Sequence, residues 1–165
     1  PAIKPAAELS QNKCLGLLAT PATIARPYTE QLIKDFAPGC VCIRIGSSRL
    51  VQIAEASLRG HPPHDSELLD ICRPFVEAPL RPDVVVLGCT HFPLLKASLV
   101  RILPTVLWLD SGQAVAERVK FHLSAQPPTP TLEAPAFFTQ LEQDSRELRK
   151  SLAEFGLTAV YHFPL

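Results

Sequence analysis

The chain has 165 residues, and 16 lysines and arginines balance 16 aspartates and glutamates to a formal net charge of zero. This balance argues against nucleic acid or an anionic membrane as the main partner, and 47% hydrophobic with 19% charged residues excludes a disordered chain. No apolar stretch approaches the roughly 18 residues of a membrane span and no basic leader precedes one, so we expect no membrane contact. Length alone predicts one domain of average size.

Apolar patterns predict alternating strands and helices over the first 123 residues. Short apolar runs are expected as strands at 14–19, 40–45, 83–89 and 106–109. Stripes at helical spacing are expected as helices at 28–36, 50–58, 65–76, 93–102 and 112–123. The run 83–89 (DVVVLGC) is apolar on both faces, which is typical of a central strand in a parallel sheet.

Polar residues and glycines predict where two of these helices begin and end. Ser47 or Ser48 is expected to cap the helix 50–58, and Gly60 is expected to end it. Asp65 is expected to cap the following helix. The residues of that helix expected to face inward are Leu68, Leu69, Cys72 and either Phe75 or Val76.

The last forty residues differ in composition from the rest. Residues 126–135 (QPPTPTLEAP) carry four prolines and are expected to form an extended connector. Beyond it, an apolar stripe predicts a helix that Gly156 ends, followed by a last strand at 158–163. The stripe consists of Leu141, Leu148, Leu152 and Phe155. The order of all the elements predicts an α/β fold with a parallel sheet and helices on both faces.

The five cysteines are an odd number, which argues against a disulfide framework and favours a reducing cytoplasm. Cys40-Val41-Cys42 has the form of half a metal site, but no second pair of ligands stands at zinc spacing. We therefore expect buried structural thiols at these positions and no bound metal.

One reactive cluster follows the strongest predicted strand. Ligands of open α/β sheets bind outside the carboxyl ends of the strands, and Gly88-Cys89-Thr90-His91 stands at such an end, just before a predicted helix. Gly88 permits close approach of a ligand, the helix dipole favours the Cys89 thiolate, and His91 is near enough to assist it. Backbone N–H groups and Thr90 at the helix start suit a carboxylate. The alternative is a buried cysteine beside a helix-capping threonine.

Two other places in the sequence point to the same edge of the sheet. Thr20 and Thr23 follow the strand 14–19, where they offer hydroxyls to an anionic ligand, although helix capping explains one of them equally well. Glu55 on the helix 50–58 either polarises His91 across the site or is a solvated helix residue. The other four histidines have no ligand-like spacing and are assigned no role.

These residues also carry a family resemblance. The segment 87–95 (LGCTHFPLL) resembles the signature around the second catalytic cysteine of glutamate racemases. Further segments resemble features of that family in the same order, over roughly the first 125 residues. They are 1–6 (PAIKPA), the passage between its domains; 18–28 (LATPATIARPY), its threonine-rich loop; 50–60 (LVQIAEASLRG), its Leu-Val-x-x-Ala-Glu helix; and 109–112 (LDSG), its return to the first domain.

The resemblance implies a cofactor-independent enzyme that interconverts L- and D-glutamate for peptidoglycan synthesis. In that family two cysteines face each other across the substrate Cα; one thiolate removes the α-proton, and the other thiol protonates the opposite face. Cys89 matches the second base, on the L-glutamate side, His91 the histidine that assists it, and Glu55 the acidic helper. The substrate-binding positions that the resemblance implies are Thr90, Thr20 and Thr23.

The same resemblance implies that part of the enzyme is absent, because nothing in this sequence matches the family's first catalytic cysteine. The implied parts are a crossover at 1–12, the second racemase domain at 13–110 and a segment at 111–165 that returns to the first domain, with the connector 126–135 inside it. The initial Pro1 and the absence of methionine suit a chain that begins at a domain crossover. We expect such a chain to have negligible racemase activity by itself.

Three alternatives stand beside this interpretation. A related amino-acid or hydantoin racemase shares the cysteine motif. A non-catalytic truncated protein would act by association, and the partners to consider beside glutamate are a second copy in a homodimer and, by family analogy alone, DNA gyrase. A Cys/His hydrolase would use Cys89 as its nucleophile, although the oxyanion-binding and triad context that it needs is missing.

Overall fold

The structure is a computed structural model that describes residues 2–123, 134–140 and 145–164. Its elements in chain order are α1 (Ile3–Leu9), β1 (Cys14–Ala19), α2 (Pro21–Ile24), α3 (Pro27–Phe36), β2 (Val41–Gly46), α4 (Arg49–Leu58), α5 (Asp65–Glu77), β3 (Val84–Leu87), the 3₁₀ turn η1 (Phe92–Leu95), α6 (Lys96–Ile102), β4 (Leu107–Leu109), α7 (Gly112–Leu123), β5 (Pro135–Phe138), α8 (Arg146–Glu154) and β6 (Ala159–His162). Each predicted strand and helix is found with bounds shifted by a few residues, except that the first turn of the helix predicted at 93–102 is the 3₁₀ turn η1. Three elements, α1, α2 and β5, are additions that the sequence pattern did not predict.

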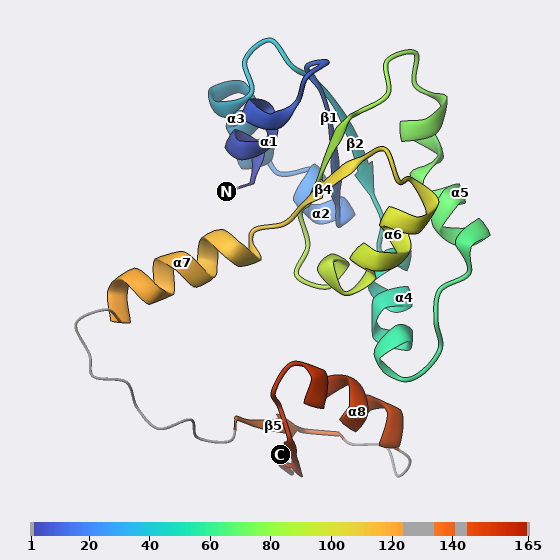
Figure 1. Cartoon of the computed structure of the whole chain (residues 1–165), viewed down its shortest axis with the longest axis vertical. Coiled ribbons are helices and arrows are strands. Elements are labelled where there is room, and N and C mark those ends of the chain that lie inside the picture. Colours follow the sequence, from blue (N-terminus) through green and yellow to red (C-terminus); the bar gives the residue numbers. More distant parts are fainter. Residues whose placement is uncertain (1, 124–133, 141–144, 165) are drawn as a thin grey trace.

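Four parallel strands form the central sheet in the order β2-β1-β3-β4. Helices α4, α5 and α6 pack on one face of this sheet, and α1 and α3 pack on the other (Figure 1). The arrangement confirms the predicted α/β fold with a parallel sheet and helices on both faces. It also brings the carboxyl ends of all four strands to one edge, where ligand sites of such sheets form.

The two central strands supply the core on both faces of the sheet. All residues of β1 and β3 are buried, and along β3 the side chains alternate between the face of α4 and α5, as Val85 does, and the face of α1, as Val84 does. Gly16 of β1 is required by this packing, because a Cβ there would lie 2.6 Å from Val85 Cγ2 and 2.9 Å from Phe75. The strands that end at the candidate site are therefore fixed by close packing against α5.

The amino end of the sheet is fastened by Asp83, which immediately precedes β3. Its carboxylate accepts hydrogen bonds from Ser10 Oγ at 2.6 Å and from the backbone N–H groups of Gln11 and Asn12 at 2.7 and 3.1 Å. Burial by itself would raise the pKa of Asp83, but these hydrogen bonds outweigh burial and lower the pKa. The link between β3 and the loop that joins α1 to β1 thus depends on an ionised carboxylate.

Helix α4 is defined at both of its ends. Ser47 Oγ accepts a hydrogen bond from Leu50 N at 3.1 Å, whereas Ser48, the other predicted cap, makes no side-chain cap bond. Gly60 follows the helix with a φ of +86°, a conformation that favours glycine, and so ends it as predicted. Both ends of α4 are therefore defined by residues outside the helix, Ser47 before it and Gly60 after it.

Two details predicted for α5 are wrong. Asp65 is the first residue of the helix, and His64 occupies the cap position without a side-chain cap bond. The inward stripe of α5 consists of Leu68, Cys72 and Phe75. Leu69 is 41% exposed, because each residue turns about 100° around a helix and carries Leu69 away from that stripe.

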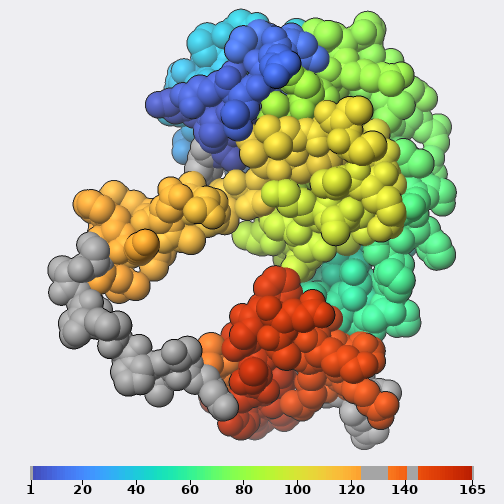
Figure 2. Space-filling view, viewed as in Figure 1, coloured from blue at the N-terminus to red at the C-terminus, as the bar shows by residue number. Residues whose placement is uncertain are grey.

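Beyond β4 the chain forms two parts outside the main sheet. Helix α7 extends away from β4, and α8 with the parallel pair β5–β6 forms a small unit (Figures 1 and 2). The unit, orange to red in Figure 2, lies beside α4, and Ser151 Oγ of α8 donates a hydrogen bond to Leu58 O of α4 at 3.0 Å. Within the described ranges, no helix is both long and apolar enough to cross a membrane.

The predictions for the tail are met in part. Leu148 of the predicted stripe is buried, whereas Phe155 is 62% exposed because it follows the end of α8. Pro135, predicted as the last residue of the connector, begins β5. Residues 126–133 of the predicted connector lie outside the described residues, and so does Leu141.

Candidate active site

The candidate site begins where β3 ends. Gly88 N donates a hydrogen bond to Leu18 O of β1 at 2.8 Å, which continues the sheet by one residue. A Cβ on Gly88 would lie 3.1 Å from both Ala19 Cβ and Leu17 Cδ1, so the close approach to β1 favours glycine. The following residue, Cys89, is half-buried at the carboxyl edge of the sheet.

The element after Cys89 differs from the predicted one. The 3₁₀ turn η1, whose second residue is Pro93, comes first, and the α-helix α6 starts only at Lys96. Cys89 therefore does not stand at the N-terminus of an α-helix, and the predicted stabilisation of its thiolate by a helix dipole does not apply. Stabilisation of the Cys89 thiolate therefore has to come from the side chains around it.

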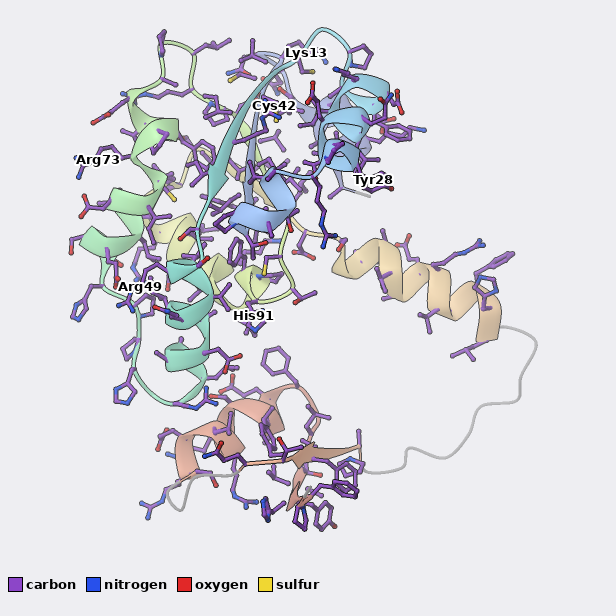
Figure 3. All side chains as sticks on the ribbon, turned by 180° about the vertical axis from the view of Figure 1, so that it is seen from behind. Lys13, Tyr28, Cys42, Arg49, Arg73 and His91 are labelled. Atoms are coloured by element: carbon purple, nitrogen blue, oxygen red, sulfur yellow. The ribbon has the colours of Figure 1, made fainter. Side chains whose placement is uncertain are left out.

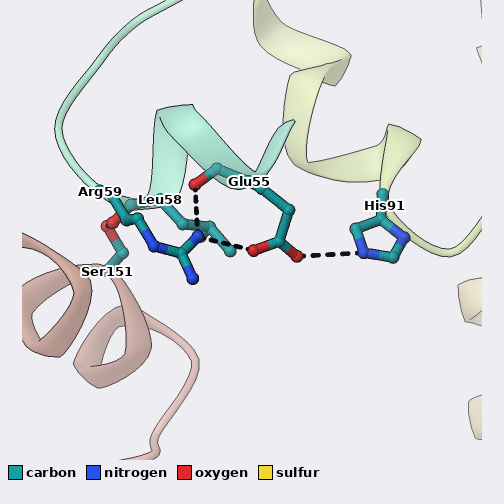
Figure 4. Close-up of polar contacts among 5 residues, drawn as sticks. All are labelled: Glu55, Leu58, Arg59, His91 and Ser151. Atoms are coloured by element: carbon teal, nitrogen blue, oxygen red, sulfur yellow. Dashed lines mark hydrogen bonds and ion pairs between the residues drawn. The ribbon is translucent and has the colours of Figure 1, made fainter. Parts of the chain in front are cut away.

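Those side chains form a series from Cys89 outward. Cys89 Sγ lies 3.8 Å from His91 Nδ1, within the longer range of a sulfur hydrogen bond, and His91 Nε2 lies 3.1 Å from Glu55 Oε1. Glu55 Oε2 in turn accepts a hydrogen bond from Arg59 Nη1 at 2.7 Å (Figure 4). In the tautomer whose proton is on Nε2, that nitrogen donates to the Glu55 carboxylate and Nδ1 can accept the proton of the Cys89 thiol. The series thus has the form of a thiol, a base and an acid that orients the base.

The carboxylate in this series is kept ionised. The hydrogen bond from Arg59 is the largest cause that lowers the pKa of Glu55; burial opposes it, and the charges of Arg59 and His91 add to the lowering. The Glu55 and His91 side chains are 42% and 35% exposed, so solvent reaches both groups. Glu55 is therefore a charged residue in contact with an imidazole, and it is not the purely solvated helix residue that the sequence left as an alternative.

The two predicted threonines occupy different positions. Thr20 caps the short helix α2, because its Oγ1 accepts a hydrogen bond from Thr23 N at 3.3 Å. The two hydroxyl oxygens lie 3.0 Å apart, and Thr29 Oγ1 donates to Thr23 O at 2.6 Å. The capping alternative thus applies to Thr20, whereas Thr23 is fixed from both sides and lines the pocket described next.

A pocket of about 700 Å³ opens beside Cys89. It brings together three of the predicted site residues, Cys89, Thr90 and Thr23, whereas His91, Glu55 and Thr20 are not among its lining residues. Most of the other lining side chains are apolar and come from β1, β3, α3, α7 and the start of the chain. A concave, mainly apolar pocket with a few polar groups is the usual form of a small-molecule site.

Sequence reasoning missed five polar or aromatic residues that line this pocket, namely Arg26, Tyr28, Thr29, Asp110 and Ser111. Asp110 was open to prediction, because it directly follows β4 and so stands at a strand's carboxyl end. Its carboxylate lies 3.3 Å from Lys96 Nζ and also accepts a hydrogen bond from Gly112 N at 2.8 Å. Arg26 and Tyr28 flank the first residue of α3, and only the position of that helix places them at the pocket.

The remaining cysteines lie away from this edge. Figure 3 shows Cys42 at the opposite end of the sheet from His91. Burial raises the pKa of Cys42 to about 11 and that of Cys72 to about 12. Cys14 donates a hydrogen bond to Leu80 O at 3.2 Å, and burial is the largest cause that raises its pKa. All five cysteines are free; Cys14 and Cys72 are buried, as structural thiols are, whereas Cys40 and Cys42 are half-buried, so the expectation of buried thiols at these two positions is wrong.

Comparison with known proteins gives this arrangement a family. The pattern of the Asp/Glu/Hydantoin racemase family matches residues 1–119. The glutamate racemase of Klebsiella pneumoniae (strain 342) is 44% identical over an alignment that covers the whole chain and 59% of that protein. The glutamate racemase of Salmonella typhimurium is 50% identical over 129 residues, which are 78% of this chain and 46% of that protein.

A solved structure shows the same likeness in three dimensions. The crystal structure of Escherichia coli glutamate racemase in complex with L-glutamate and the activator UDP-MurNAc-Ala superimposes with a TM-score of 0.89 and 38% identity. The match covers 99% of this chain and 63% of that one. The chain thus spans about three fifths of the length of these relatives. With 119 of its 165 residues matched by the family pattern, the chain belongs to the Asp/Glu/hydantoin racemase family.

Proposed function

We propose that the protein is a glutamate racemase and that residues 13–110 supply the half of its active site that acts on L-glutamate. The observation that carries the proposal is the series of Cys89, His91 and Glu55 beside a 700 Å³ pocket. The relatives support glutamate as the substrate, because the Klebsiella and Salmonella proteins are both named glutamate racemase and the Escherichia coli structure contains L-glutamate.

In the proposed reaction, His91 Nδ1 first accepts the Cys89 proton, and the Glu55 carboxylate stabilises the imidazolium at Nε2. The Cys89 thiolate then removes the α-proton of L-glutamate, and the electron pair of the C–H bond stays on the substrate, delocalised into its carboxyl group. A thiol on the opposite face gives its proton to Cα, which produces D-glutamate. The reaction needs no cofactor, since one thiol takes up a proton and the other releases one.

The α-proton of an amino acid is very weakly acidic, so the substrate carboxylate has to be held in place. We assign this task to the hydroxyls of Thr90 and Thr23, two residues that line the pocket, and we assign Thr20 the task of orienting the Thr23 hydroxyl across the 3.0 Å contact. The Arg26 guanidinium in the same lining suits a second carboxylate. A substrate with two carboxylates, such as glutamate, matches this set of donors.

The opposing thiol has no candidate among the five cysteines, all of which lie in the described part of the chain. Cys14 begins β1, and Cys40 and Cys42 lie at the start of β2, so all three stand at the far end of the sheet. Cys72 is buried in α5. We propose that this thiol belongs to a part of the racemase that these residues do not include, and that the chain alone has negligible activity.

A chimaera tests this function. The chain replaces the matching 59% of the Klebsiella pneumoniae glutamate racemase, and D-glutamate formed from L-glutamate is measured for the chimaera, for its Cys89→Ser variant and for the isolated chain. We expect turnover by the chimaera, a loss of at least about a thousandfold in the variant, and almost none by the isolated chain. Isolated-chain turnover near that of the chimaera would refute the half-site assignment. A chimaera that prefers aspartate or a hydantoin would refute glutamate as the substrate.

A second candidate function, association without catalysis, is favoured by one specific observation. Apolar side chains beyond Ser111 are exposed on α7 and β5, among them Val115, Val119 and Phe137. Such a surface suits burial against another protein surface, in a homodimer or against a partner such as DNA gyrase. Size-exclusion chromatography of the chain tests the first of these cases: a dimer supports self-association, and a monomer at every concentration refutes it.

We also propose that the protein acts in the cytoplasm and supplies D-glutamate for peptidoglycan synthesis. Five free cysteines suit a reducing compartment. Rescue of a bacterial strain that requires D-glutamate, by the chimaera with Cys89 but not with Cys89→Ser, is the expected result. Growth that does not depend on Cys89 would contradict the proposal.

A further inference from the structure

Arg59 is placed to set the direction in which the Glu55 carboxylate points. Its Nη1 donates to Glu55 Oε2 at 2.7 Å and also to the Glu55 backbone carbonyl at 3.0 Å, one helical turn earlier on α4. The other carboxylate oxygen, Oε1, then faces His91 Nε2 at 3.1 Å. Figure 4 shows the resulting line from Arg59 through Glu55 to His91. The Glu55 carboxylate thus contacts two groups, one with each oxygen: the Arg59 guanidinium at the end of the same helix and the His91 imidazole of the site.

The backbone around Arg59 is itself held by the C-terminal unit. Ser151 Oγ of α8 donates to Leu58 O at 3.0 Å, which is the carbonyl just before Arg59 (Figure 4). Glu147 of α8 lies against Gly60, where an added Cβ would meet Glu147 Cγ at 3.0 Å. Helix α8 therefore contacts the residues on both sides of Arg59. The end of α4 that carries this cation is therefore held by α8, a helix that lies far from it in the sequence.

Two effects of Arg59 on the site oppose each other. Its positive charge competes with His91 for the Glu55 carboxylate, which weakens the help that His91 receives. Its hydrogen bonds hold a side chain that is 42% exposed and that would otherwise rotate in solvent, which strengthens that help. At this exposure the solvent screens the effect of the charge, whereas the orientation set by hydrogen bonds is local and is not screened. We therefore expect the orienting effect of Arg59 on Glu55 to be larger than the competing effect of its charge, so that Arg59 on balance strengthens the help that His91 receives.

We propose that Arg59 is a positioning residue, which holds Glu55 toward His91 and so promotes ionisation of the Cys89 thiol. The proposal rests on the proposed function in taking Cys89 as the reacting thiol. Its test, however, measures the reactivity of that thiol directly and requires no racemisation. A chimaera that forms no D-glutamate would refute the proposed function and leave this inference standing.

The test is the rate at which iodoacetamide alkylates Cys89 in the full chain between pH 6 and 9, followed by mass spectrometry. We expect Arg59→Gln to slow the reaction at neutral pH roughly two- to fivefold, the range of a partly exposed ion pair. Glu55→Gln should slow it at least as much, and the double variant no more than Glu55→Gln alone, because Arg59 acts through Glu55. Arg59→Lys should restore at least half of the lost rate.

Arg49→Gln is the matched control, since Arg49 lies on the same helix but pairs with Glu67, away from the site. It should leave the rate unchanged. Alkylation of the buried Cys72 in the same samples reports unfolding, and a slower Cys89 with an unreactive Cys72 supports the proposal. Faster or unchanged alkylation in Arg59→Gln overturns it, as does a double variant whose loss equals the product of the two single losses or an equal loss in Arg49→Gln.

Discussion

The two ends of the central sheet carry similar residue types and use them differently. At the amino end, the Asp83 carboxylate is occupied by Ser10 and two backbone N–H groups, and the Cys14 thiol donates to a backbone carbonyl. At the carboxyl end, the Glu55 carboxylate reaches an imidazole, and that imidazole reaches the thiol of Cys89 beside an open pocket. A thiol and a carboxylate therefore form a candidate site only where a proton acceptor lies between them and a pocket gives a ligand access to the thiol.

The strongest expected difference between the two ends is in thiol reactivity. At pH 8, a pKa of about 11 for Cys42, at the amino end, leaves roughly one thiolate in a thousand, and a pKa of about 12 for Cys72, which is buried in α5 and serves as a reference, leaves roughly one in ten thousand. We expect iodoacetamide to label Cys89 about a hundredfold faster than either of them in the native chain. Site-resolved mass spectrometry measures the labelling rates of all five cysteines together. Labelling of Cys42 before Cys89 would contradict the expected difference between the two ends of the sheet.

The amino end should instead control stability. Asp83→Asn places an amide group against the N–H donors of Gln11 and Asn12, and we expect a loss of roughly 2 kcal/mol in the free energy of unfolding. Urea denaturation measures this loss. Asp70→Asn is the control, because its ion pair with Arg73 is exposed and should change stability by less than about 0.5 kcal/mol.

The same carboxylate predicts a dependence on pH. Because folding lowers the pKa of Asp83, its contribution is present above the unfolded value near 4 and is lost as the pH falls through the folded value. Between pH 7 and pH 3, the wild-type chain should therefore lose more stability than Asp83→Asn does. Equal losses in the two proteins would show that the ionised carboxylate does not fasten this end.

The smallest expected effect concerns the helix that carries Glu55. Ser47→Ala removes the hydroxyl that accepts a hydrogen bond from Leu50 N and should cost about 1 kcal/mol. Ser48→Ala is a closely matched control, since this neighbouring serine makes no cap bond and should change almost nothing. Thermal unfolding of both variants decides between them, and equal shifts would disprove the assignment of the cap.

Much of the fold was open to prediction because its signals are local. The apolar runs of β1 and β3 and the glycines that end α4 and α8 are readable within a few residues. The additions, α1, α2 and β5, are too short for a periodic pattern, since α2 has four residues and β5 begins with a proline. Their positions depend on tertiary packing, as when α1 places Ala6 fully buried in the core.

The candidate site was predictable to the extent that its residues cluster in the sequence. Cys89, Thr90 and His91 are adjacent and follow a strand, which marks them as candidates. Glu55 lies 36 residues from His91, and only the packing of α4 beside η1 shows that the two side chains touch. Arg59 gave no sequence signal, because a basic residue at the end of an amphipathic helix is ordinary.

The most direct test of the central claim follows the α-proton of L-glutamate by NMR in D₂O, with the chimaera that contains this chain. We predict that the α-proton signal disappears with the unaltered chimaera and with Cys72→Ser, and that it persists with Cys89→Ser, because only Cys89 is placed to remove it. Loss of the signal at an undiminished rate with Cys89→Ser would contradict the assignment of Cys89 as the base on the L-glutamate side.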